Sequence, residues 1–575
     1  MKRYWKYIRP YIQYYILGPC FMMMEVVGDV LLPYMLAKII NQGIAERNVV
    51  YIIKIGAIMG LISVIMAVGG VLGAWFASKA AMNFGADLRM DLFEKIQQFS
   101  FQNIDNFSTG SLITRLTNDI TQIQNMIMMT LRMCLRSPGI LIGAMVMAFV
   151  ISPKLAAIFI IVLPVLAVLI VVIMRRAFPQ FRTLQEKLDA LNSCIQEGLV
   201  GIRLIKSFVR GDYEEMRFEK RNQQLKEANL TAMKTMLLYT PLMTLALNIT
   251  TVVVVWSGGN MIVAGNMQVG DLTAFTNYIV QIMSSLTMLS IAFLNWARAI
   301  ASFRRVGEVL DEKIDLTDEN AKHKDRAVCE GSVEFQNVSF RYYKNSPEWV
   351  IENISFKLEA GKTLGIIGPT GSGKSTLVSM IPRLYDTDEG TVLVDGINVR
   401  DYGLKPLREG IGMVLQNNTL FSGSITENLK WGDEHADEKA VRKAAQNAQA
   451  AGFIDSFKDG YRTHLEQSGN NVSGGQKQRL CIARALLKCP KILILDDSTS
   501  AVDTATERAI REALHSEYKD MTKIIIAQRI RSVMDADEIL VLDNGKTAGF
   551  GTHEQLLADC LVYREIYDVQ NGREE

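Results

Sequence analysis

The chain has 575 residues, which is too long for one compact domain and predicts at least two. Hydrophobic residues make up 49% of it and charged residues 21%, a balance that excludes a disordered chain and favours a part embedded in a membrane. The formal net charge of +2 gives no electrostatic case for nucleic acid as a partner.

Apolar runs dominate the first half of the sequence, and each is long enough, at about 20 residues, to cross a bilayer as a helix. The third and fourth are separated only by Ser152-Pro153-Lys154, which predicts a tight hairpin at one membrane face. The first follows the basic segment MKRYWKYIRP, but it is too long for a signal-peptide core and carries acids, so it is interpreted as a span. The six predicted spans lie near 14–40, 51–78, 129–151, 155–174, 237–263 and 273–297.

Basic residues are distributed unevenly around these runs, and short loops rich in Lys and Arg stay on the cytoplasmic side. They precede the first span and fill the connection 175–231, whereas the loop 258–270 has none. We therefore expect a multi-pass protein of the plasma membrane with its N-terminus, its two long connections (about 80–128 and 175–231) and its second half in the cytoplasm. Both connections have helical periodicity, which predicts long helices that extend beyond the membrane.

Two acids, Glu25 and Asp29, lie one helical turn apart on the same face of the first span. Ionisable groups inside a membrane segment are costly and face the bundle interior or a water-filled cavity. They are candidates for binding a cationic substrate or carrying protons, and the alternative is that they pair with neighbouring helices. Methionines are numerous around them, which suits either a tolerant cavity or ordinary packing.

The seven cysteines show neither metal-ligand spacing nor a dense disulfide pattern. We expect ordinary buried thiols in a reducing setting. They are Cys20, Cys134, Cys194, Cys329, Cys481, Cys489 and Cys560.

The second half contains the pattern G-x-x-x-x-G-K-S, from Gly368 to Ser375, between the strand-like TLGII and the helix-like LVSMIPRLY. In this context backbone N–H groups and a helix N-terminus cradle phosphates. Lys374 would reach the β- and γ-phosphates, and the Ser375 hydroxyl would ligate Mg²⁺. The nucleotide-binding candidates of this loop are Gly368, Thr370, Gly371, Ser372, Gly373, Lys374, Ser375 and Thr376.

Two further motifs follow downstream. In KILILDDSTSAVD, an apolar strand from Ile492 to Leu495 directly precedes Asp496. A carboxylate at the end of a buried strand beside a phosphate loop suits a water-mediated contact with Mg²⁺. Between the two motifs, NVSGGQKQR (Asn471 to Arg479) enters a helix with a Ser and two glycines, which form a second anion-binding nest.

In this order and spacing, the motifs resemble those of the ATP-binding cassette (ABC) transporter family, and specifically an exporter-type half-transporter with a fused membrane domain. The resemblance covers almost the whole chain. It implies a six-helix transmembrane domain with long cytoplasmic extensions over 1–311, a linker over 312–330, and an α/β P-loop nucleotide-binding domain with a helical signature subdomain over 331–575. In such proteins two cassettes sandwich two ATP molecules with Mg²⁺.

The resemblance also implies roles for single residues. The signature that contacts the ATP of the partner's phosphate loop is Ser473, Gly474, Gly475 and Gln476. Gln416 matches the Q-loop and joins Ser375 and Asp496 as a metal ligand, Asp503 matches the D-loop, and Glu466 lies in the loop before the signature. Tyr342 matches the aromatic residue that stacks on adenine, although the adjacent Tyr343 leaves the register open by one.

The chain departs from the family pattern at two catalytic positions. The general base that follows the Mg²⁺ aspartate is usually Glu, and here it is Asp497, which is one methylene shorter. The histidine that contacts the γ-phosphate after the next strand is replaced by Gln528. Glutamine can donate a hydrogen bond to phosphate, but it cannot become a cation.

Both departures affect hydrolysis and spare the residues that bind ATP. The preferred interpretation is a site that binds ATP and turns it over very slowly, while the intact signature completes a competent site in a different half-transporter, one with Glu and His at these positions. The alternative is harmless variation in an active enzyme. Two segments resemble the coupling loops of exporters: 103–119, with its bend at Phe107 to Arg115, and 201–218.

The sequence therefore predicts a subunit of an ATP-driven exporter that moves small amphiphilic or drug-like compounds out of the cell as a heterodimer. A lipid or peptide exporter subunit is the alternative within transport. A regulatory membrane protein that binds ATP without pumping is the alternative from another class.

Overall fold

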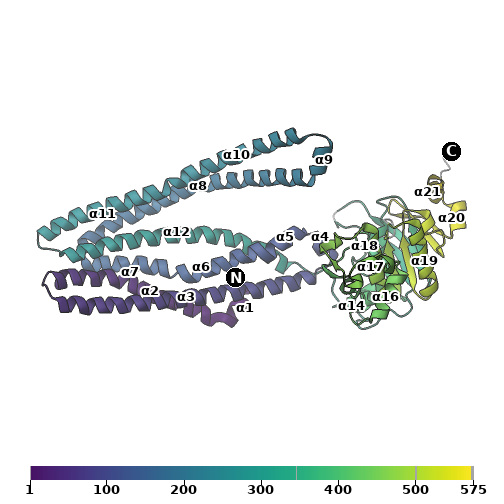
Figure 1. Ribbon diagram of the computed structural model, residues 1–575, viewed down its shortest axis with the longest axis horizontal. Helices are drawn as coiled ribbons and strands as arrows, with labels where there is room; N and C mark the ends of the chain where they lie inside the picture. The colour runs from purple at the N-terminus through teal and green to yellow at the C-terminus, as the bar shows by residue number, and fades with distance from the viewer. Residues whose placement is uncertain (1, 345, 499–501, 572–575) are drawn as a thin grey trace. The chain divides into compact units, whose positions relative to one another are not determined.

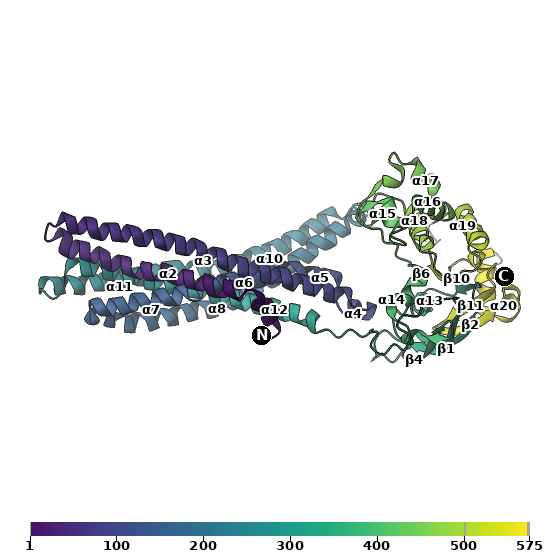
Figure 2. The same ribbon diagram turned by 90° about the horizontal axis from the view of Figure 1, so that it is seen from below.

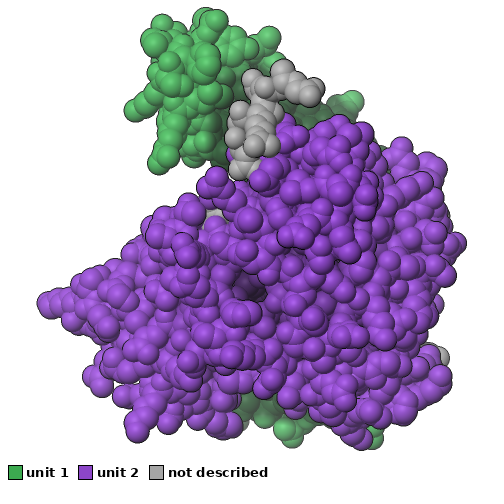
Figure 3. Space-filling model, turned by 90° about the vertical axis from the view of Figure 1, so that its right-hand side faces the viewer, with its two compact units in different colours: residues 1–97, 110–311 green, residues 98–109, 312–575 purple. Residues whose placement is uncertain are grey.

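The computed structural model describes residues 2–344, 346–498 and 502–571, without the side chains of several positions between 290 and 298. It divides into two compact units. Unit 1 consists of residues 1–97 and 110–311, and unit 2 consists of residues 98–109 and 312–575 (Figure 3). The predicted boundaries at 311 and 331 stay predictions.

Unit 1 is built of helices, several of them far longer than a bilayer is thick (Figure 1). Short irregular turns join most of them, and α2 and α5 each continue through a π-helical turn, Ile39–Ile44 and Arg115–Asp119. The helices are α1 Trp5–Ile8, α2 Ile12–Lys38, α3 Val49–Gln97, α5 Thr109–Thr114, α6 Ile120–Met133, α7 Arg136–Ile151, α8 Pro153–Val200, α9 Ile202–Ser207, α10 Gly211–Leu237, α11 Tyr239–Val263 and α12 Val269–Asp311.

Within the described residues, five helical stretches are long and apolar enough to cross a membrane. The sixth predicted span, 273–297, falls within α12, some of whose side chains lie outside the described part. The count of six therefore stays a prediction. The five stretches are Trp5–Ile44, Val49–Gln97, Thr109–Ile151, Pro153–Val200 and Gly211–Val263.

The predicted hairpin between the third and fourth spans is confirmed. Ser152 alone separates α7 from α8 and has an extended backbone. Its hydroxyl accepts a hydrogen bond from the backbone N–H of Leu155 at 3.4 Å, and Pro153 takes the first helical position. Both features are typical of a helix N-terminus, so α8 restarts without a loop.

Small residues bring the long helices of unit 1 into close contact. On α3, Gly73 and Ala77 are buried against Gly18 of α2, and a Cβ at Gly73 would lie 3.1 Å from the Gly18 carbonyl oxygen. Such approaches favour helix association in membranes, where burial of apolar surface gives little driving force. Both ribbon views show α8 running beside α10 and α11 (Figures 1 and 2), and Figure 1 shows α9 connecting α8 to α10.

The first coupling segment differs from the prediction. Its short separate helix is α4, Phe101–Asp105, which Ser100 and Asn103 cap reciprocally. Residues 106–108 are not helical, and the next helix begins at Thr109. The predicted bend at Phe107 to Arg115 is therefore wrong for most of its length. The second segment contains the short helix α9, which is followed directly by the start of α10.

Unit 2 contains a six-stranded sheet in the order β12-β11-β3-β10-β9-β6 and a four-stranded sheet in the order β2-β1-β4-β5. In the larger sheet β3, β6, β9, β10 and β11 are parallel, and β12 is antiparallel at the edge. The strands are β1 Val333–Phe340, β2 Ile351–Leu358, β3 Thr363–Ile367, β4 Glu389–Val394, β5 Ile397–Asn398, β6 Ile411–Val414, β7 Gly423–Ser424, β8 His464–Leu465, β9 Ile492–Asp496, β10 Thr522–Ile526, β11 Glu538–Asp543 and β12 Lys546–Gly551.

The register of this sheet determines where the site lies. Ile526, the last residue of β10, is paired with Ile366 of β3 on one side and with Asp496 of β9 on the other. The loops that follow these three strands therefore leave the same edge of the sheet, which is the usual ligand side of a parallel sheet. This edge carries the phosphate loop, Asp497 and Gln528.

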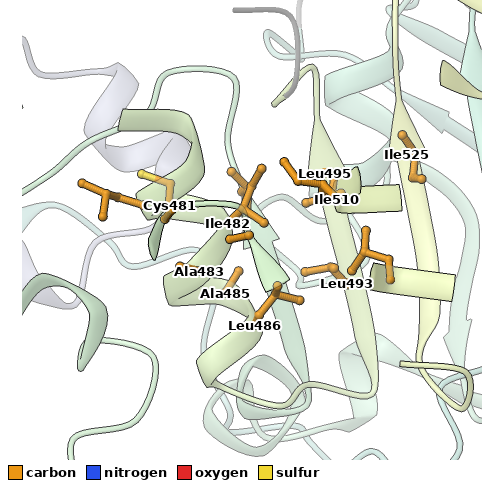
Figure 4. Close-up of a cluster of buried hydrophobic side chains, with 14 of the residues drawn as sticks. Cys481, Ile482, Ala483, Ala485, Leu486, Leu493, Leu495, Ile510 and Ile525 are labelled. Carbon is orange, nitrogen blue, oxygen red and sulfur yellow. The ribbon is translucent and has the colours of Figure 1, made fainter. Parts of the chain in front are cut away.

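The helices of unit 2 pack around this sheet, and α18 carries the predicted signature at its start. Apolar side chains of α18, including Ile482 and Leu486, meet Leu493 and Leu495 of β9 in one buried cluster (Figure 4). The predicted helix after the phosphate loop is shorter than expected, since α13 ends at Ser379. The helices are α13 Lys374–Ser379, α14 Leu404–Glu409, α15 Ile425–Leu429, α16 Glu438–Asn447, α17 Ala451–Ser456, α18 Gly474–Leu487, α19 Thr504–Glu517, α20 His553–Asp559 and α21 Leu561–Asn571.

The expectation of buried cysteines is wrong for part of the set. All seven are free thiols, but Cys20, Cys329 and Cys489 are exposed and Cys134 is half-buried. Exposure is decided by the element that carries each thiol, which cysteine spacing does not reveal.

Candidate nucleotide site

The phosphate loop follows β3, and its glycines are required by the backbone. At Gly368 φ is +156°, and a Cβ would lie 2.0 Å from the carbonyl oxygen of Leu542. At Gly373 φ is +90°, and a Cβ would lie 2.9 Å from the carbonyl oxygen of Val350. A side chain at either position would be strained and would collide with backbone. The loop can thus close tightly over the start of α13.

Lys374, the first residue of α13, folds back over this loop. Its ammonium donates hydrogen bonds to the carbonyl oxygens of Gly368, at 2.8 Å, and Pro369, at 2.7 Å. Burial lowers the pKa of Lys374, while the nearby Asp497 and Asp496 carboxylates act in the opposite direction. The ammonium also lies 3.4 Å from the Ser372 hydroxyl. A half-buried ammonium whose partners are neutral oxygens is well placed to exchange them for phosphate oxygens.

Two of the predicted metal ligands contact each other. The Ser375 hydroxyl donates to Oδ1 of Asp496 at 2.9 Å, and Asp496 is 3% exposed at the end of β9. Burial raises the pKa of Asp496, and the Ser375 hydrogen bond opposes that effect. A hydroxyl and a carboxylate at this distance suit a hard cation such as Mg²⁺, which prefers oxygen ligands. Gln416, the third, is exposed just after β6, the strand next to β9.

The two positions that depart from the family pattern also contact each other. The side-chain amide of Gln528 donates to Oδ2 of Asp497 at 2.8 Å. Asp497 has a left-handed backbone, with φ of +46°, and its N–H donates to the Ile526 carbonyl oxygen at 3.1 Å. Burial raises the pKa of Asp497, and the Gln528 hydrogen bond lowers it. One carboxylate oxygen of the expected base is therefore engaged by the neighbouring amide.

Tyr342 lies beside α13, which supports the first of the two possible registers. Its hydroxyl is 2.8 Å from the Thr376 hydroxyl, whereas Tyr343 is 74% exposed. The Tyr342 ring meets Tyr385 edge-on, with the centroids 5.3 Å apart. The Tyr385 hydroxyl donates to Oδ2 of Asp105 in α4 at 2.9 Å. Tyr385 therefore contacts both the predicted adenine-stacking ring and α4, a connection that the sequence reasoning missed.

The signature residues begin α18. Ser473 caps the helix reciprocally with Gln476: its hydroxyl accepts from the Gln476 N–H at 3.3 Å, and the Gln476 side chain accepts from the Ser473 N–H at 2.9 Å. Gly474 and Gly475 form the first turn, and Ser473 and Gly474 are exposed. This rigid and accessible helix start can present N–H groups to an anion from outside.

Asp503 and Glu466 have local contacts. Asp503 caps α19, where its carboxylate accepts from the N–H and the hydroxyl of Thr506, at 3.0 and 2.7 Å. Residues 499–501 of the same loop lie outside the described part. The backbone N–H of Glu466 donates to the Asn471 side chain at 3.0 Å.

In unit 1 the two acids of α2 share one cation, Arg136 at the start of α7. Its guanidinium lies 2.8 Å from the Glu25 carboxylate and 3.4 Å from the Asp29 carboxylate. Gln281 of α12 donates to the Asp29 backbone carbonyl at 2.7 Å. This arrangement corresponds to the alternative in which the acids pair with a neighbouring helix. Among the side chains that the structure describes, this group of three carries one formal negative charge in excess.

Comparisons with known proteins cover both halves of the chain. A family described as ABC transporter transmembrane region matches residues 15–286, and one described as ABC transporter matches residues 351–500. The chain is 39% identical to the ABC transporter ATP-binding protein YfiB of Bacillus subtilis, over 100% of this chain and 99% of that protein. It is 37% identical to the ABC transporter ATP-binding protein Rv1273c of Mycobacterium tuberculosis, over 98% of this chain and 97% of that protein.

The fold is similar to that of a solved structure as well. It is the structure of a bacterial Atm1-family ABC exporter with ATP bound. The match has a TM-score of 0.81 and a sequence identity of 24%, and it covers 98% of this chain and 98% of that chain.

Proposed function

Because the chain belongs to the ABC transporter family, as an ATP-driven exporter half-transporter with a fused nucleotide-binding domain, we propose that it is the slow-hydrolysing subunit of a heterodimeric exporter. Its own ATP site retains the nucleotide, and its signature completes a fast site in a different half-transporter. The single observation that carries this proposal is the 2.8 Å hydrogen bond between Gln528 and Asp497.

The binding half of the site is complete. Lys374 would exchange its carbonyl partners for the β- and γ-phosphates, and Tyr342 would stack on adenine once its hydroxyl leaves Thr376. Ser375, Asp496 and Gln416 would hold Mg²⁺, directly or through water, and the ion would neutralise phosphate charge. The close contact of Ser375 with Asp496 supports this assignment.

The hydrolytic half is impaired for two physical reasons. A general base must come within hydrogen-bond reach of the attacking water, and misplacement by about 1 Å can cost about 100-fold in rate. Asp497 is one methylene shorter than glutamate, and one of its oxygens already accepts from Gln528. Gln528 is neutral, so it adds no positive charge at the γ-phosphate where charge develops.

The partner follows from the same asymmetry. The capping box of Ser473 and Gln476 holds the signature ready for a phosphate that another subunit brings. A homodimer would contain two poor sites, whereas a heterodimer contains one poor and one good site. The partner therefore carries Glu after its Mg²⁺ aspartate and His at its switch position, and the slow site acts as a persistent hinge while the fast site cycles.

ATP binding is transmitted to the membrane half through contacts that differ between the nucleotide states. The path Tyr342–Tyr385–Asp105 supports a direct link from the adenine end of the site to α4. The helix α9 would provide the second coupling contact, on the partner's cassette. The uneven distribution of basic residues supports a cytoplasmic location of the N-terminus, both coupling helices and the cassette.

The cargo is proposed to be a small amphiphilic, drug-like compound. One relative, YgaD of Bacillus subtilis, is 33% identical over 99% of this chain and has a name that suggests multidrug export. The excess negative charge of Glu25, Asp29 and Arg136 favours a monocation. With Glu25→Gln and Asp29→Asn together, we expect export of a cationic dye to fall while export of a neutral dye persists. Equal effects on the two dyes would indicate that the acids do not take part in substrate binding.

The test of the heterodimer compares one lesion at two sites. In liposomes that contain this chain and its candidate partner, we expect Asp497→Asn to leave uphill dye transport within about twofold of the wild type. The matched Glu→Gln change in the partner should abolish transport. Equal losses from the two changes would contradict the asymmetry, and ATP-gated flux that never runs uphill would favour the regulatory alternative.

A further inference from the structure

The helix α21 is hydrogen-bonded to the backbone of the loop that follows β10. The side-chain oxygen of Gln570 accepts a hydrogen bond from the Ile530 N–H at 2.8 Å. Its side-chain nitrogen donates to the Gln528 carbonyl oxygen, also at 2.8 Å. A single amide thus binds the backbone on both sides of Arg529. Gln528 itself reaches forward to Asp497.

The helix that carries Gln570 is firmly anchored. Tyr563 is fully buried, and its hydroxyl is 2.7 Å from Nδ1 of His553 in α20. Ile566 and Tyr567 pack against the buried cluster of unit 2. Gln570 therefore extends from a fixed support toward a loop that borders a pocket of about 770 Å³, lined in part by Asp497, Gln528 and Gln570. Without the amide contact, the loop has room to move.

We propose that Gln570 is a positioning residue for the ATP site: its two hydrogen bonds fix the backbone of Gln528, so that the Gln528 amide stays directed at Asp497 and at the γ-phosphate. The inference rests on the proposed slow site and deepens it. Retention of ATP then depends on α21, which contains none of the predicted nucleotide- or metal-binding residues. A change at the C-terminal helix would shorten the time for which the slow site stays closed.

The experiment measures release of ATP from the full-length protein in nanodiscs, loaded with radiolabelled ATP and Mg²⁺ and chased with unlabelled ATP. With Gln570→Ala we expect release to be about 2- to 10-fold faster, because a lost hydrogen bond corresponds to roughly that ratio. Deuterium exchange in residues 528–533 should accelerate as well. Val569→Ala is the matched control, since Val569 is 76% exposed on the same helix, and it should change neither quantity.

Two further variants separate positioning from a general structural effect. Gln570→Glu retains the acceptor for Ile530 but loses the donor to Gln528, so its release rate should be intermediate. Gln528→Ala alone should accelerate release, and the addition of Gln570→Ala should accelerate it no further. An additive double variant, or Gln570→Ala with unchanged release and exchange, would overturn the inference. If Gln528→Ala also has no effect, or the wild type hydrolyses ATP before releasing it, the proposed slow site fails instead.

Discussion

Two corners of the same sheet edge differ in how closely they follow their family's chemistry. The corner after β3 contains the residues predicted to hold phosphate, with glycines at which a side chain would collide with backbone and a lysine folded over the loop. The corner after β9 and β10 has the shorter Asp497 at the predicted base position and the neutral Gln528 at the predicted switch position, and the two are hydrogen-bonded to each other. The residues of the phosphate loop and the residues expected to act in cleavage therefore lie in separate corners, although both corners lie at one edge and Gln528 is also proposed to slow the release of ATP.

The largest expected effect concerns ATP binding by the corner after β3. Lys374→Ala removes the cation that is predicted to contact two phosphates, so we expect ATP affinity at this site to fall by about 100-fold, equivalent to roughly 3 kcal/mol. Equilibrium binding of a fluorescent ATP analogue to the full-length chain measures it. Lys458→Ala, an exposed lysine of the same domain, should have no effect. A loss below about threefold with Lys374→Ala would contradict the assignment of the phosphate loop.

The next prediction restores the residues that the family usually has in the corner after β9 and β10. Asp497→Glu together with Gln528→His should raise ATP turnover by about 10- to 100-fold, since the base regains its reach and the switch can carry charge. Steady-state phosphate release from the assembled pair measures this. Asp497→Glu combined with Asp496→Asn should remain slow, because the metal ligand is lost. Unchanged ATP turnover in this double variant would mean that residues 497 and 528 do not cause the slow hydrolysis.

A third prediction concerns the adenine end of the intact corner. Tyr342→Ala should weaken ATP binding by about 10-fold, because stacking of a base on an aromatic ring contributes roughly 1–3 kcal/mol. Tyr342→Phe retains the ring and should bind within about twofold of the wild type. Tyr343→Ala serves as the register control. If Tyr343→Ala weakened binding and Tyr342→Ala did not, the register would be shifted by one.

The smallest effect is expected where the binding corner meets α4. Tyr385→Phe removes only the hydrogen bond to Asp105 and retains the aromatic contacts, so ATP affinity should be unchanged. Stimulation of ATPase activity by a transported dye should fall by about two- to fivefold, because a net hydrogen bond contributes about 0.5–1 kcal/mol. Asp105→Asn should have a similar effect. A loss of ATP affinity in Tyr385→Phe would indicate a role in binding rather than in coupling.

Local patterns predicted much of this architecture. The glycine loop follows a strand, Asp496 ends a buried strand, and Ser152-Pro153 restarts a helix; in each case neighbours in sequence determine the geometry. The motifs also indicated correctly that the chain is an ABC exporter half-transporter. The roles of single residues in the site are proposals that the geometry supports.

What the sequence did not reveal depends on contacts between distant segments. Asp497 and Gln528 meet because β9 and β10 are neighbours in the sheet. Neither sequence motif contains information about this strand order. Gln570 and Tyr385 belong to no recognised pattern and act through backbone or ring contacts. The non-helical segment after α4 spans only residues 106–108, which the sequence pattern did not locate, so the predicted bend extended several residues too far into the following helix.

The most direct test of the asymmetric site is the fate of ATP on this chain alone. After the purified protein is incubated with Mg²⁺ and radiolabelled ATP, the bound nucleotide is extracted and separated into ATP and ADP. We predict that nearly all of it is still ATP and that phosphate release stays near background, with Lys374→Ala retaining no nucleotide. Rapid conversion to ADP by a symmetric pair of this chain would contradict the account.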